Sequence, residues 1–366
     1  MKQWIIHLEA KSDLLIPSLP TGGNESESVS FIPGSALRGA FAAGRAPGHG
    51  SQPDDGFAAA FLSPHVVFCD AVPVPVGSGA AFRPVPLSAM TCKRRPGFPA
   101  DEGHGVYGRF RGPCPPECPE CRAPMERFAG WYSRSDGQLR SFSPSFAQQA
   151  HVGLDDHTGQ AAEGALFTEF RIPRETKLEG AIRLLSDEEH EIESLEQYLG
   201  LRAGADDTLY VGRGGGRVKA WFSTSNQDPT SGLSELRDGQ LVELVLESPA
   251  IVQDDFGRCL RSLDVNALAA MLHIQPAALG LRCVKHYAFT HWVWGWNGAH
   301  DLPKPRDLAL ARGSCGVFEV TDAKSAKSNL ESLLTRGGGF RTNEGFGQVA
   351  VADPEIWTTT GVGDGG

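Results

Sequence analysis

Cysteines in a proline-rich stretch are the residues whose spacing points most directly to chemistry. Cys114, Cys118 and Cys121 fall as C-x3-C-x2-C, with Cys92 upstream and His104 between. Closely spaced thiolates fit two vertices of a zinc tetrahedron, and a glycine- and proline-rich insertion has little apolar sequence to hold it folded otherwise. The spacing therefore predicts a structural zinc bound by Cys92, Cys114, Cys118 and Cys121, with His104 as the alternative fourth ligand.

A catalytic zinc would need an open coordination position and a general base nearby, and the spacing gives no sign of either. Disulfides are not expected, because the first residues carry a charge inside their apolar stretch and lack a small-residue cleavage site. The other cysteines lie in strand-like or mixed surroundings and are expected to be buried small hydrophobic residues, namely Cys69, Cys259, Cys283 and Cys315.

The segment IPGSALRG near the start can form an anion seat. Pro33 and Gly34 place a tight bend before a helix that Ser35 can cap, and the first amides of a helix are unpaired. Arg38 follows within about the first turn, so amides and guanidinium together suit a phosphate. The alternative is a capped helix that packs its apolar side into the core.

The segment TRGGGFRTNEGFGQVAV near the end has a related composition. Its glycines follow a predicted helix, Arg336 and Arg341 lie close by, and Phe340 and Phe346 are interleaved. Glycines allow close approach of a ligand, arginines suit phosphate and aromatic rings suit bases. GxxxxGK[ST] is absent and the glycines end a helix, which argues against a nucleoside triphosphate site. The alternative is a long glycine turn.

The elements expected to position these segments follow the order strand, helix, strand, strand, helix, strand about twice. In the first series, strands are expected at 4–10, 65–74, 165–172, 178–185 and in a hairpin within 208–222, and helices at 35–43 and 187–199. In the second series, strands are expected at 241–252, 281–296, 315–320 and 347–353, and helices at 264–272 and 324–337. The fold class is therefore α+β, with two ferredoxin-like (RRM-like) βαββαβ domains. The first domain spans 1–225 and contains the zinc-binding insertion at about 84–132, which is expected to have little regular structure of its own. The second domain spans 226–353 and carries the glycine-rich loop. A disordered tail is expected at 354–366.

Composition limits the partners. The 366 residues include 40% hydrophobic and 21% charged residues, typical of a folded protein, and no run reaches the roughly 18 apolar residues of a membrane span. A formal net charge of −10 argues against coating nucleic acid through bulk electrostatics but allows a local basic groove. We expect a cytoplasmic protein without a membrane partner.

The two glycine-containing segments carry a family resemblance. IPGSALRG resembles the N-terminal signature of the RAMP superfamily of CRISPR-associated proteins, and NEGFGQV with its preceding glycines resembles that superfamily's C-terminal glycine-rich loop. The segments occur in the expected order and flank the two ferredoxin-like series.

A narrower resemblance covers most of the remaining chain. HVGLDDHTGQAAEGALFTEFRI, the insertion ending CPECRAP and VWGWNGAHDLPKPRDLALARGSCGVFEV are similar to the type III-D subunit family called Csx-ten, of the Cas-five-like group. This resemblance implies a subunit that caps the crRNA 5′ handle, docks on Cas-ten-like and Cas-seven-like subunits and meets target RNA indirectly.

The resemblance also implies roles for matching residues. Ser35 and Arg38 would face RNA at the helix start, and the C-terminal loop would lie against the RNA backbone. That loop comprises Gly338, Gly339, Arg341, Gly345 and Gly347. A predicted hairpin without an internal acidic residue can add phosphate contacts through Arg213, Arg217 and Lys219, although a solvated hairpin explains these charges equally well.

The same resemblance separates binding from cleavage. Target-cutting subunits of the Cas-seven group carry an aspartate before IPGSSLRG, whereas PTGGNESESVSF has none, and only Glu25 and Glu27 can substitute. We therefore expect a non-catalytic binding subunit. The alternative is a RAMP endoribonuclease, which would use one of the available histidines, His7, His65, His151 or His157. A third possibility is a zinc-stabilised interaction protein unrelated to RNA.

Overall fold

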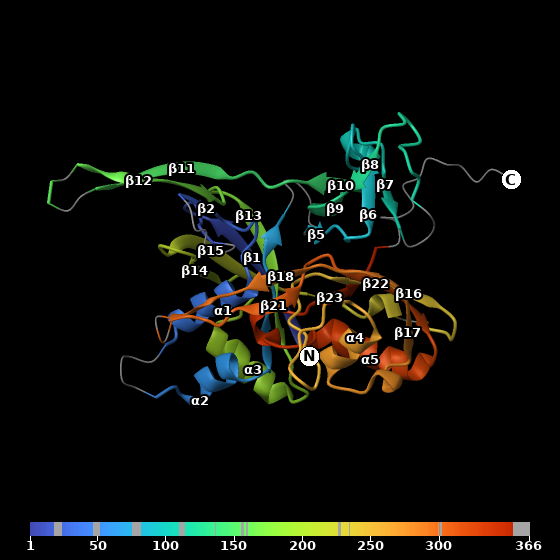
Figure 1. Ribbon diagram of the computed structural model, residues 1–366. Coiled ribbons are helices and arrows are strands. Elements are labelled where there is room, and N and C mark those ends of the chain that lie inside the picture. Colours follow the sequence, from blue (N-terminus) through green and yellow to red (C-terminus); the bar gives the residue numbers. More distant parts are fainter. Residues whose placement is uncertain are drawn as a thin grey trace. The chain divides into compact units, whose positions relative to one another are not determined.

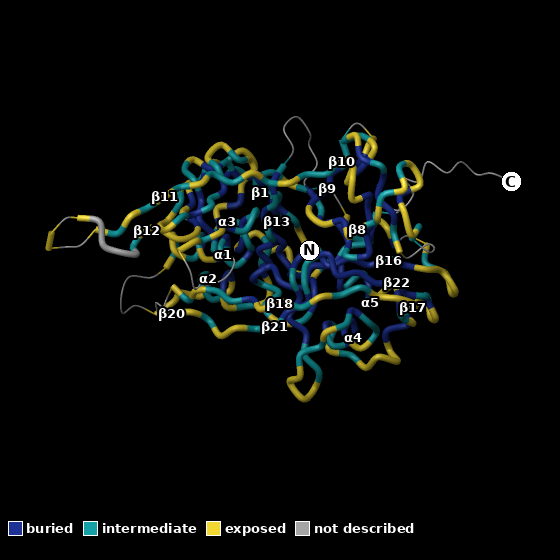
Figure 2. Tube along the Cα trace, turned by 45° about the horizontal axis from the view of Figure 1, so that its top comes forward, coloured by how far each residue is buried: buried dark blue, intermediate teal, exposed yellow. Residues whose placement is uncertain are grey.

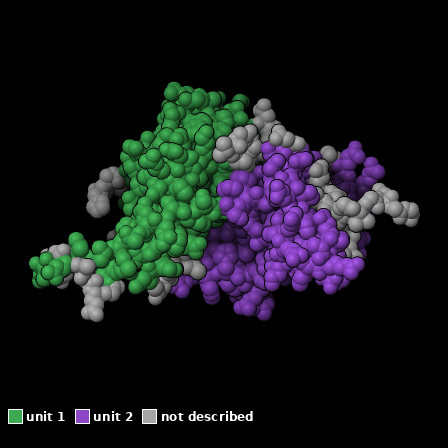
Figure 3. Space-filling model, turned by 90° about the horizontal axis from the view of Figure 1, so that it is seen from above, with its two compact units in different colours: residues 1–74, 144–226, 294–305 green, residues 75–143, 227–293, 306–366 purple. Residues whose placement is uncertain are grey.

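The structure is a computed structural model in which two compact units can be distinguished (Figure 3). Unit 1 comprises residues 1–74, 144–226 and 294–305, and unit 2 comprises 75–143, 227–293 and 306–366. The described residues are 1–17, 24–46, 52–74, 82–109, 114–135, 137–154, 157–158, 160–225, 228–233, 235–298, 300 and 302–353. The tail predicted to be disordered, 354–366, lies outside them.

Unit 1 is built on an antiparallel sheet in the order β14-β15-β1-β13-β3, with β4 also paired to β13. Along β1, every second residue from Trp4 to Ala10 is buried, because alternate side chains of a strand point to one face. The strands are β1 (Lys2–Ala10), β3 (Val66–Phe68), β4 (Val72–Pro73), β13 (Lys177–Leu184), β14 (Asp206–Val211) and β15 (Gly216–Thr224).

Two helices supply the other half of this core, α1 (Gly34–Ala43) and α3 (Glu189–Leu199) (Figure 1). Leu37 and Phe41 of α1 and Leu195 and Leu199 of α3 are buried with the inward side chains of the sheet. A short helical segment, α2 (Asp55–Phe57), continues into a π-helical turn (Ala58–Leu62). The element order β1-α1-β3-β13-α3-β15 thus follows the predicted series, with β14 added at the edge.

A second sheet of unit 1 differs from the sequence prediction. The predicted strand at 165–172 belongs to β12 (Ala161–Arg171), which pairs with β11 (Ala147–Leu154) and β2 (Glu25–Glu27) instead of the strand that follows it. β11 was not predicted, because its AQQAHVGL sequence alternates half-buried and exposed residues without a buried face. Short strands β19 (Trp296–Asn297) and β20 (Leu302–Pro303) also pair in this unit.

Unit 2 contains an antiparallel sheet in the order β17-β22-β16-β23. Its helices α4 (Val265–Leu272) and α5 (Ala323–Arg336) begin at Asp264 and Asp322, whose carboxylates accept backbone amides of the first turn. The strands are β16 (Leu241–Leu246), β17 (Leu281–Tyr287), β22 (Cys315–Val320) and β23 (Val349–Val351). The order β16-α4-β17-β22-α5-β23 follows the second predicted series, and buried residues gather around these elements (dark blue in Figure 2). The predicted α+β class is confirmed.

The insertion is more ordered than its composition predicts. It forms the sheets β7-β6-β8 and β10-β9-β5 around a small core that includes Phe98, Phe128 and Tyr132. The prediction of little regular structure was wrong because these strands are too short to show periodicity. They are β5 (Arg83–Pro84), β6 (Ala89–Cys92), β7 (Val106–Gly108), β8 (Met125–Arg127), β9 (Trp131–Ser135) and β10 (Gln138–Phe142).

Residues 75–143, assigned from the sequence to the N-terminal domain, group with unit 2. The Leu87 amide donates to the Gly313 carbonyl at 2.8 Å, Arg83 pairs with Glu247 at 3.1 Å, and Arg134 pairs with Asp353. Unit 2 also contains the ribbon β18 (Thr290–Val293) and β21 (Asp307–Leu310). None of the helices in the described part of the chain contains an apolar stretch of the length needed to span a bilayer.

Candidate functional site

A cluster of metal-binding side chains lies in the insertion. The ligand atoms of Cys92, His104, Cys118 and Cys121 all lie within 4.8 Å of one another. The sulfurs of Cys92 and Cys121 are 3.5 Å apart, and Cys118 Sγ is 3.4 Å from His104 Nδ1. Sulfurs around a tetrahedral zinc are separated by about 3.8 Å, given Zn–S bonds of about 2.3 Å. The four side chains therefore fit a metal ion such as zinc.

Local turns bring these ligands together. The Cys118 amide donates to the Ala123 carbonyl at 2.8 Å and the Arg122 amide donates to Cys118 at 2.8 Å, which closes the CPEC turn. Upstream, the His104 amide donates to the Arg95 carbonyl at 3.0 Å, and this loop returns His104 to Cys92 at the end of β6. The end of β6, the loop that carries His104 and the CPEC turn thus come together at the cluster.

The surroundings of the cluster favour ligation. Burial of Cys92 opposes ionisation, but hydrogen bonds to its sulfur from the backbone of Arg95, from Cys121 and from the backbone of Arg94 lower its pKa to about 6. His104 Nε2 lies 3.5 Å from a Glu120 carboxylate oxygen, an arrangement that orients ligating histidines in metal sites. The thiolate form of Cys92 is therefore accessible near neutral pH.

The fourth residue of the cluster is His104 and not Cys114, which was the first choice made from the spacing. Cys114 lies outside the cluster, and its thiol faces the Pro115 carbonyl at 3.6 Å. His104, the alternative, occupies the place predicted for Cys114. The remaining cysteines are buried at Cys69 and Cys315 but half-buried at Cys259 and Cys283, so that expectation was only partly correct. Burial raises the pKa of Cys315 to about 11.

The start of α1 differs from the predicted phosphate seat. The helix begins at Gly34 with Pro33 as its N-cap, so Ser35 lies within the first turn and does not cap it. The Gly34 amide donates to the Asp70 carboxylate at 2.7 Å, which places an anionic side chain where a phosphate was expected. Arg38 is half-buried and donates to the Phe61 carbonyl. Both features tie α1 to the segment that follows it.

The amides of the glycine-rich loop are mostly used inside unit 2. Gly338 donates to Gly347, Gly339 to Met271, Gly345 to Thr342 and Gly347 to Pro249, at 2.8–3.0 Å. A hydrogen-bonded amide is not available to a phosphate. The amides of these four glycines therefore hold the loop in place by hydrogen bonds to backbone carbonyls of unit 2.

Steric constraints explain why these positions are glycine. Gly347 has φ +70°, and a Cβ there would lie 1.8 Å from the Gly338 carbonyl oxygen. At Gly339, with φ +84°, a Cβ would lie 2.4 Å from the Ile251 carbonyl oxygen. Only glycine tolerates both the backbone conformation and the close approach.

Arg341 is held by carboxylates on this loop. Its guanidinium contacts Asp307 at 2.9 Å and Glu344 at 2.7 Å and lies over the Phe346 ring, 4.7 Å from its centroid. The Arg341 side chain is only 17% exposed. Phe346 is buried, whereas Phe340 is exposed beside His273 in an edge-to-face arrangement. Arg341 therefore fixes the loop.

Replacing Arg341 with alanine is expected to destabilise unit 2 by roughly 2–3 kcal/mol, because the largely buried Glu344 loses its guanidinium partner. The shift in the urea unfolding midpoint measures this. Arg336→Ala, at the exposed end of α5, is the control and should change stability by less than about 0.5 kcal/mol. An Arg341→Ala protein as stable as the control would contradict a loop-fixing role.

The β14–β15 hairpin presents the most accessible of the predicted cations. Arg213 and Arg217 are exposed, and no ion pair is recorded for either among the described residues. Lys219 pairs with Asp206 at 2.8 Å, and this contact raises its pKa. β14 thus begins at Asp206, two residues before the hairpin predicted from the sequence, so the observed hairpin does contain an acidic residue.

One aromatic residue on this hairpin was missed. Tyr210 is 62% exposed and lies directly opposite Arg217. The signal was present in TLYV, where strand alternation places Tyr210 on the face opposite to the buried Leu209 and Val211.

The candidate histidines have different surroundings. His7 Nε2 lies 2.8 Å from Ser223 Oγ, and its Nδ1 lies 3.2 Å from Glu179, whose pKa is raised by burial. His151 lies 3.3 Å from Glu169 and stacks on Phe167. His157 is exposed.

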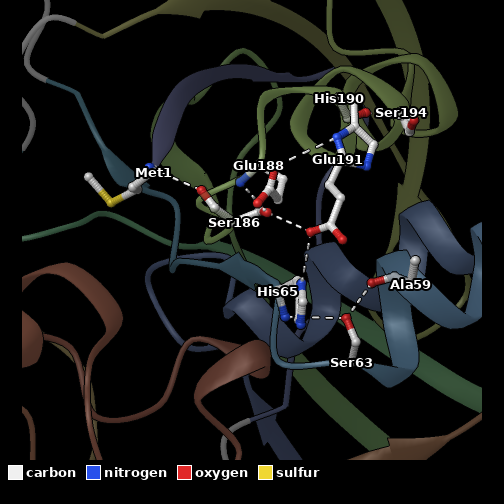
Figure 4. Close-up of polar contacts among 9 residues, drawn as sticks. All are labelled: Met1, Ala59, Ser63, His65, Ser186, Glu188, His190, Glu191 and Ser194. Carbon is white, nitrogen blue, oxygen red and sulfur yellow. Dashed lines mark hydrogen bonds and ion pairs between the residues drawn. The ribbon is translucent and has the colours of Figure 1, made fainter.

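His65 belongs to a surface network of unit 1 (Figure 4). Its Nδ1 lies 4.0 Å from Glu191, which accepts a hydrogen bond from the Ser186 hydroxyl at 2.5 Å. The Ser63 hydroxyl accepts the His65 amide instead of facing the ring. This histidine is not arranged to activate Ser63. The acidic candidates Glu25 and Glu27 are exposed on β2.

Comparison with known proteins identifies the class. The sequence profile of a CRISPR-associated protein family matches residues 136–353, more than half of the chain. The chain belongs to this family, Cas_Cmr3, a RAMP family of type III CRISPR systems. No curated protein matches the chain in sequence.

Similar solved structures are distant. A chain of the type III-B Cmr-beta complex bound to cognate target RNA has 10% identity over 86% of each chain and a TM-score of 0.45. A Cas6-related protein of Pyrococcus furiosus has 9% identity over 96% of this chain and 99% of its own, with a TM-score of 0.39. Cmr4 of Pyrococcus furiosus has 12% identity over 62% of this chain and 100% of its own, with a TM-score of 0.28. The family assignment therefore rests on the sequence match.

Proposed function

We propose that this protein is a non-catalytic crRNA-binding subunit of a type III CRISPR effector complex and that it caps the crRNA 5′ handle. The family match over residues 136–353 carries this proposal. Within the family, the segments quoted above favour the type III-D Csx-ten subunit, with Cas-ten-like and Cas-seven-like neighbours. The element order of both units supports two ferredoxin-like domains, the second of which carries the glycine-rich loop.

The candidate RNA contacts have unequal support. Arg213 and Arg217 are exposed, so they are the proposed phosphate contacts, with Lys219 beside them. Ser35 stays a proposed contact on the first turn of α1. Arg38, Arg341 and the loop glycines Gly338, Gly339, Gly345 and Gly347 make contacts within the protein, so their proposed contribution is to shape the surface that meets RNA.

The Arg213→Ala/Arg217→Ala double variant is expected to bind single-stranded crRNA roughly tenfold more weakly at physiological salt. Each lost phosphate contact should also reduce the slope of log affinity against log salt by about 0.7. Fluorescence anisotropy over a salt series measures both quantities. Arg202→Ala is the matched control, because Arg202 is exposed in the same unit before β14 begins. Equal affinities and slopes for both variants would contradict the assignment.

An endoribonuclease is the second candidate, and the position of His7 between Ser223 and Glu179 favours it. An imidazole held by a carboxylate can move a proton to or from a hydroxyl. Incubation of the purified protein with repeat RNA in EDTA tests this possibility. Specific products that disappear in His7→Gln would support the enzyme, whereas intact RNA supports the binding subunit.

Complex isolation separates both candidates from a zinc-stabilised interaction protein. Co-expression with a CRISPR array and the neighbouring subunits should yield this protein together with crRNA. Purification with protein partners but without nucleic acid would favour a role unrelated to RNA.

A further inference from the structure

The outer face of the β14–β15 hairpin carries an exposed aromatic ring, that of Tyr210. Leu209, Val211 and Val218 point into the core of unit 1, so Tyr210 and Arg217 project from the opposite face. Tyr210 and Arg217 are direct cross-strand partners. Side chains in such a pair lie about 5 Å apart, which places a cation beside an exposed ring.

A second flat surface lies further along the same face. Trp221 is four residues beyond Arg217 on β15, and its ring stacks on His7 with centroids 5.5 Å apart and an interplanar angle of 16°. Ser223 and Glu179 hold His7 from its two ring nitrogens. At about 3.4 Å per residue, the Tyr210–Arg217 level lies roughly 13 Å from Trp221. The two aromatic residues therefore lie on neighbouring strands, β14 and β15, and face the same side of the sheet.

Charges on this face favour an anion. Among the described residues of this face, Glu9 pairs with Lys11 at 2.6 Å, Asp206 pairs with Lys219 at 2.8 Å, and Glu179 contacts the His7 ring at 3.2 Å. Arg217 and Lys177 are exposed on the same face, and no ion pair is recorded for either in the described parts of the chain. Arg217, one of these two cations, is thus the cross-strand partner of Tyr210.

We propose that this face binds single-stranded RNA, with one base stacked on Tyr210, an adjoining phosphate on Arg217, and the strand running along β15 toward Trp221. Aromatic rings on a sheet accept bases regardless of sequence, and neighbouring cations bind the backbone. The ligand is an extended single strand, because a base must be unstacked to reach Tyr210. This inference rests on the proposed RNA-binding function and assigns it a surface.

The test compares Tyr210→Ala with Tyr210→Phe in the full-length protein, with single-stranded crRNA as the probe. Tyr210→Phe keeps the ring and should bind within about twofold of the unaltered protein. Tyr210→Ala should bind about 5- to 150-fold more weakly, the range for loss of one stacked base. The salt slope should stay unchanged in Tyr210→Ala and fall when Arg217 is replaced.

Phe256→Ala is the matched control. Phe256 is 83% exposed with Arg258 over its ring at 5.2 Å, but Asp254 binds Arg258 at 2.7 Å. An exposed ring beside a neutralised cation should contribute nothing to RNA affinity, so this variant should bind like the unaltered protein.

Different failures have different meanings. If Tyr210→Ala binds RNA as tightly as Tyr210→Phe, the stacking site is wrong and the RNA-binding function stands. If the unaltered protein does not bind the probe, both proposals are contradicted. If Tyr210→Ala keeps its RNA affinity but loses a neighbouring subunit from the assembled complex, this face is a protein interface and the stacking proposal is overturned.

Discussion

Replacing Cys118 with serine is expected to lower zinc content from about one ion per chain to below about 0.2 and to unfold the insertion. The insertion has only a small apolar core, and structural zinc contributes roughly 10–16 kcal/mol to folding in small zinc-binding peptides. Removal of one of the four ligands should therefore weaken zinc binding and destabilise the folded insertion. Elemental analysis measures the zinc content per chain. Limited proteolysis measures unfolding of the insertion as faster cleavage between residues 84 and 142.

Cys114→Ser provides the matched control for this result. Cys114 lies in the same loop but outside the ligand cluster, so this variant should keep its zinc and its protease resistance. His104→Ala should instead behave like Cys118→Ser. Zinc loss in Cys114→Ser with retention in His104→Ala would show that the fourth ligand is Cys114 and would contradict the structure.

Gly347→Ala is the second change expected to have a large effect. The added Cβ would lie 1.8 Å from the Gly338 carbonyl oxygen at φ +70°. The left-handed conformation costs about 1–2 kcal/mol and the overlap adds roughly as much again or more. We expect a loss of at least about 3 kcal/mol in the stability of unit 2, measured by urea unfolding, with reduced yield of soluble protein.

Gly239→Ala isolates the steric part of this effect. Gly239 has φ +80° but no atom within 4 Å of a Cβ built there, so it should cost only about 1–2 kcal/mol. Similar losses at Gly239 and Gly347 would mean that close packing of the loop against Gly338 contributes little.

The metal cluster shows how far spacing can predict a site. Cys92, Cys118 and Cys121 were predicted because nearby thiolates have few other uses in such a segment. Spacing could not decide between Cys114 and His104, because the decision depends on the loop that returns His104 to Cys92. That loop is closed by the His104–Arg95 hydrogen bond and by Gly105 donating to Gly97 at 3.1 Å, neither of which is encoded in the cysteine pattern.

The glycine-rich segments show the opposite limit. Sequence composition correctly indicated a bend before α1 and a turn after α5, because glycine and proline act locally. It could not indicate that Asp70 accepts the Gly34 amide or that Gly347 donates to Pro249. These partners are distant in sequence, and they remove the amides from the predicted phosphate sites.

The regular elements were largely predictable where periodicity extends over several residues. β1, α3, α4 and α5 show clear alternation or helical spacing and were expected at nearly their observed bounds. The predicted strand at 281–296 instead divides into β17, β18 and β19, because a continuous apolar and aromatic run does not show where the chain turns.

Cross-linking within the assembled complex tests directly whether this subunit caps the crRNA 5′ handle. The protein is co-expressed with its CRISPR array and neighbouring subunits, the complex is irradiated with ultraviolet light, and the peptides joined to crRNA are identified by mass spectrometry. If this subunit caps the crRNA 5′ handle, the handle should cross-link to it within residues 206–224. A complex that contains crRNA whose handle cross-links only to other subunits would contradict this role.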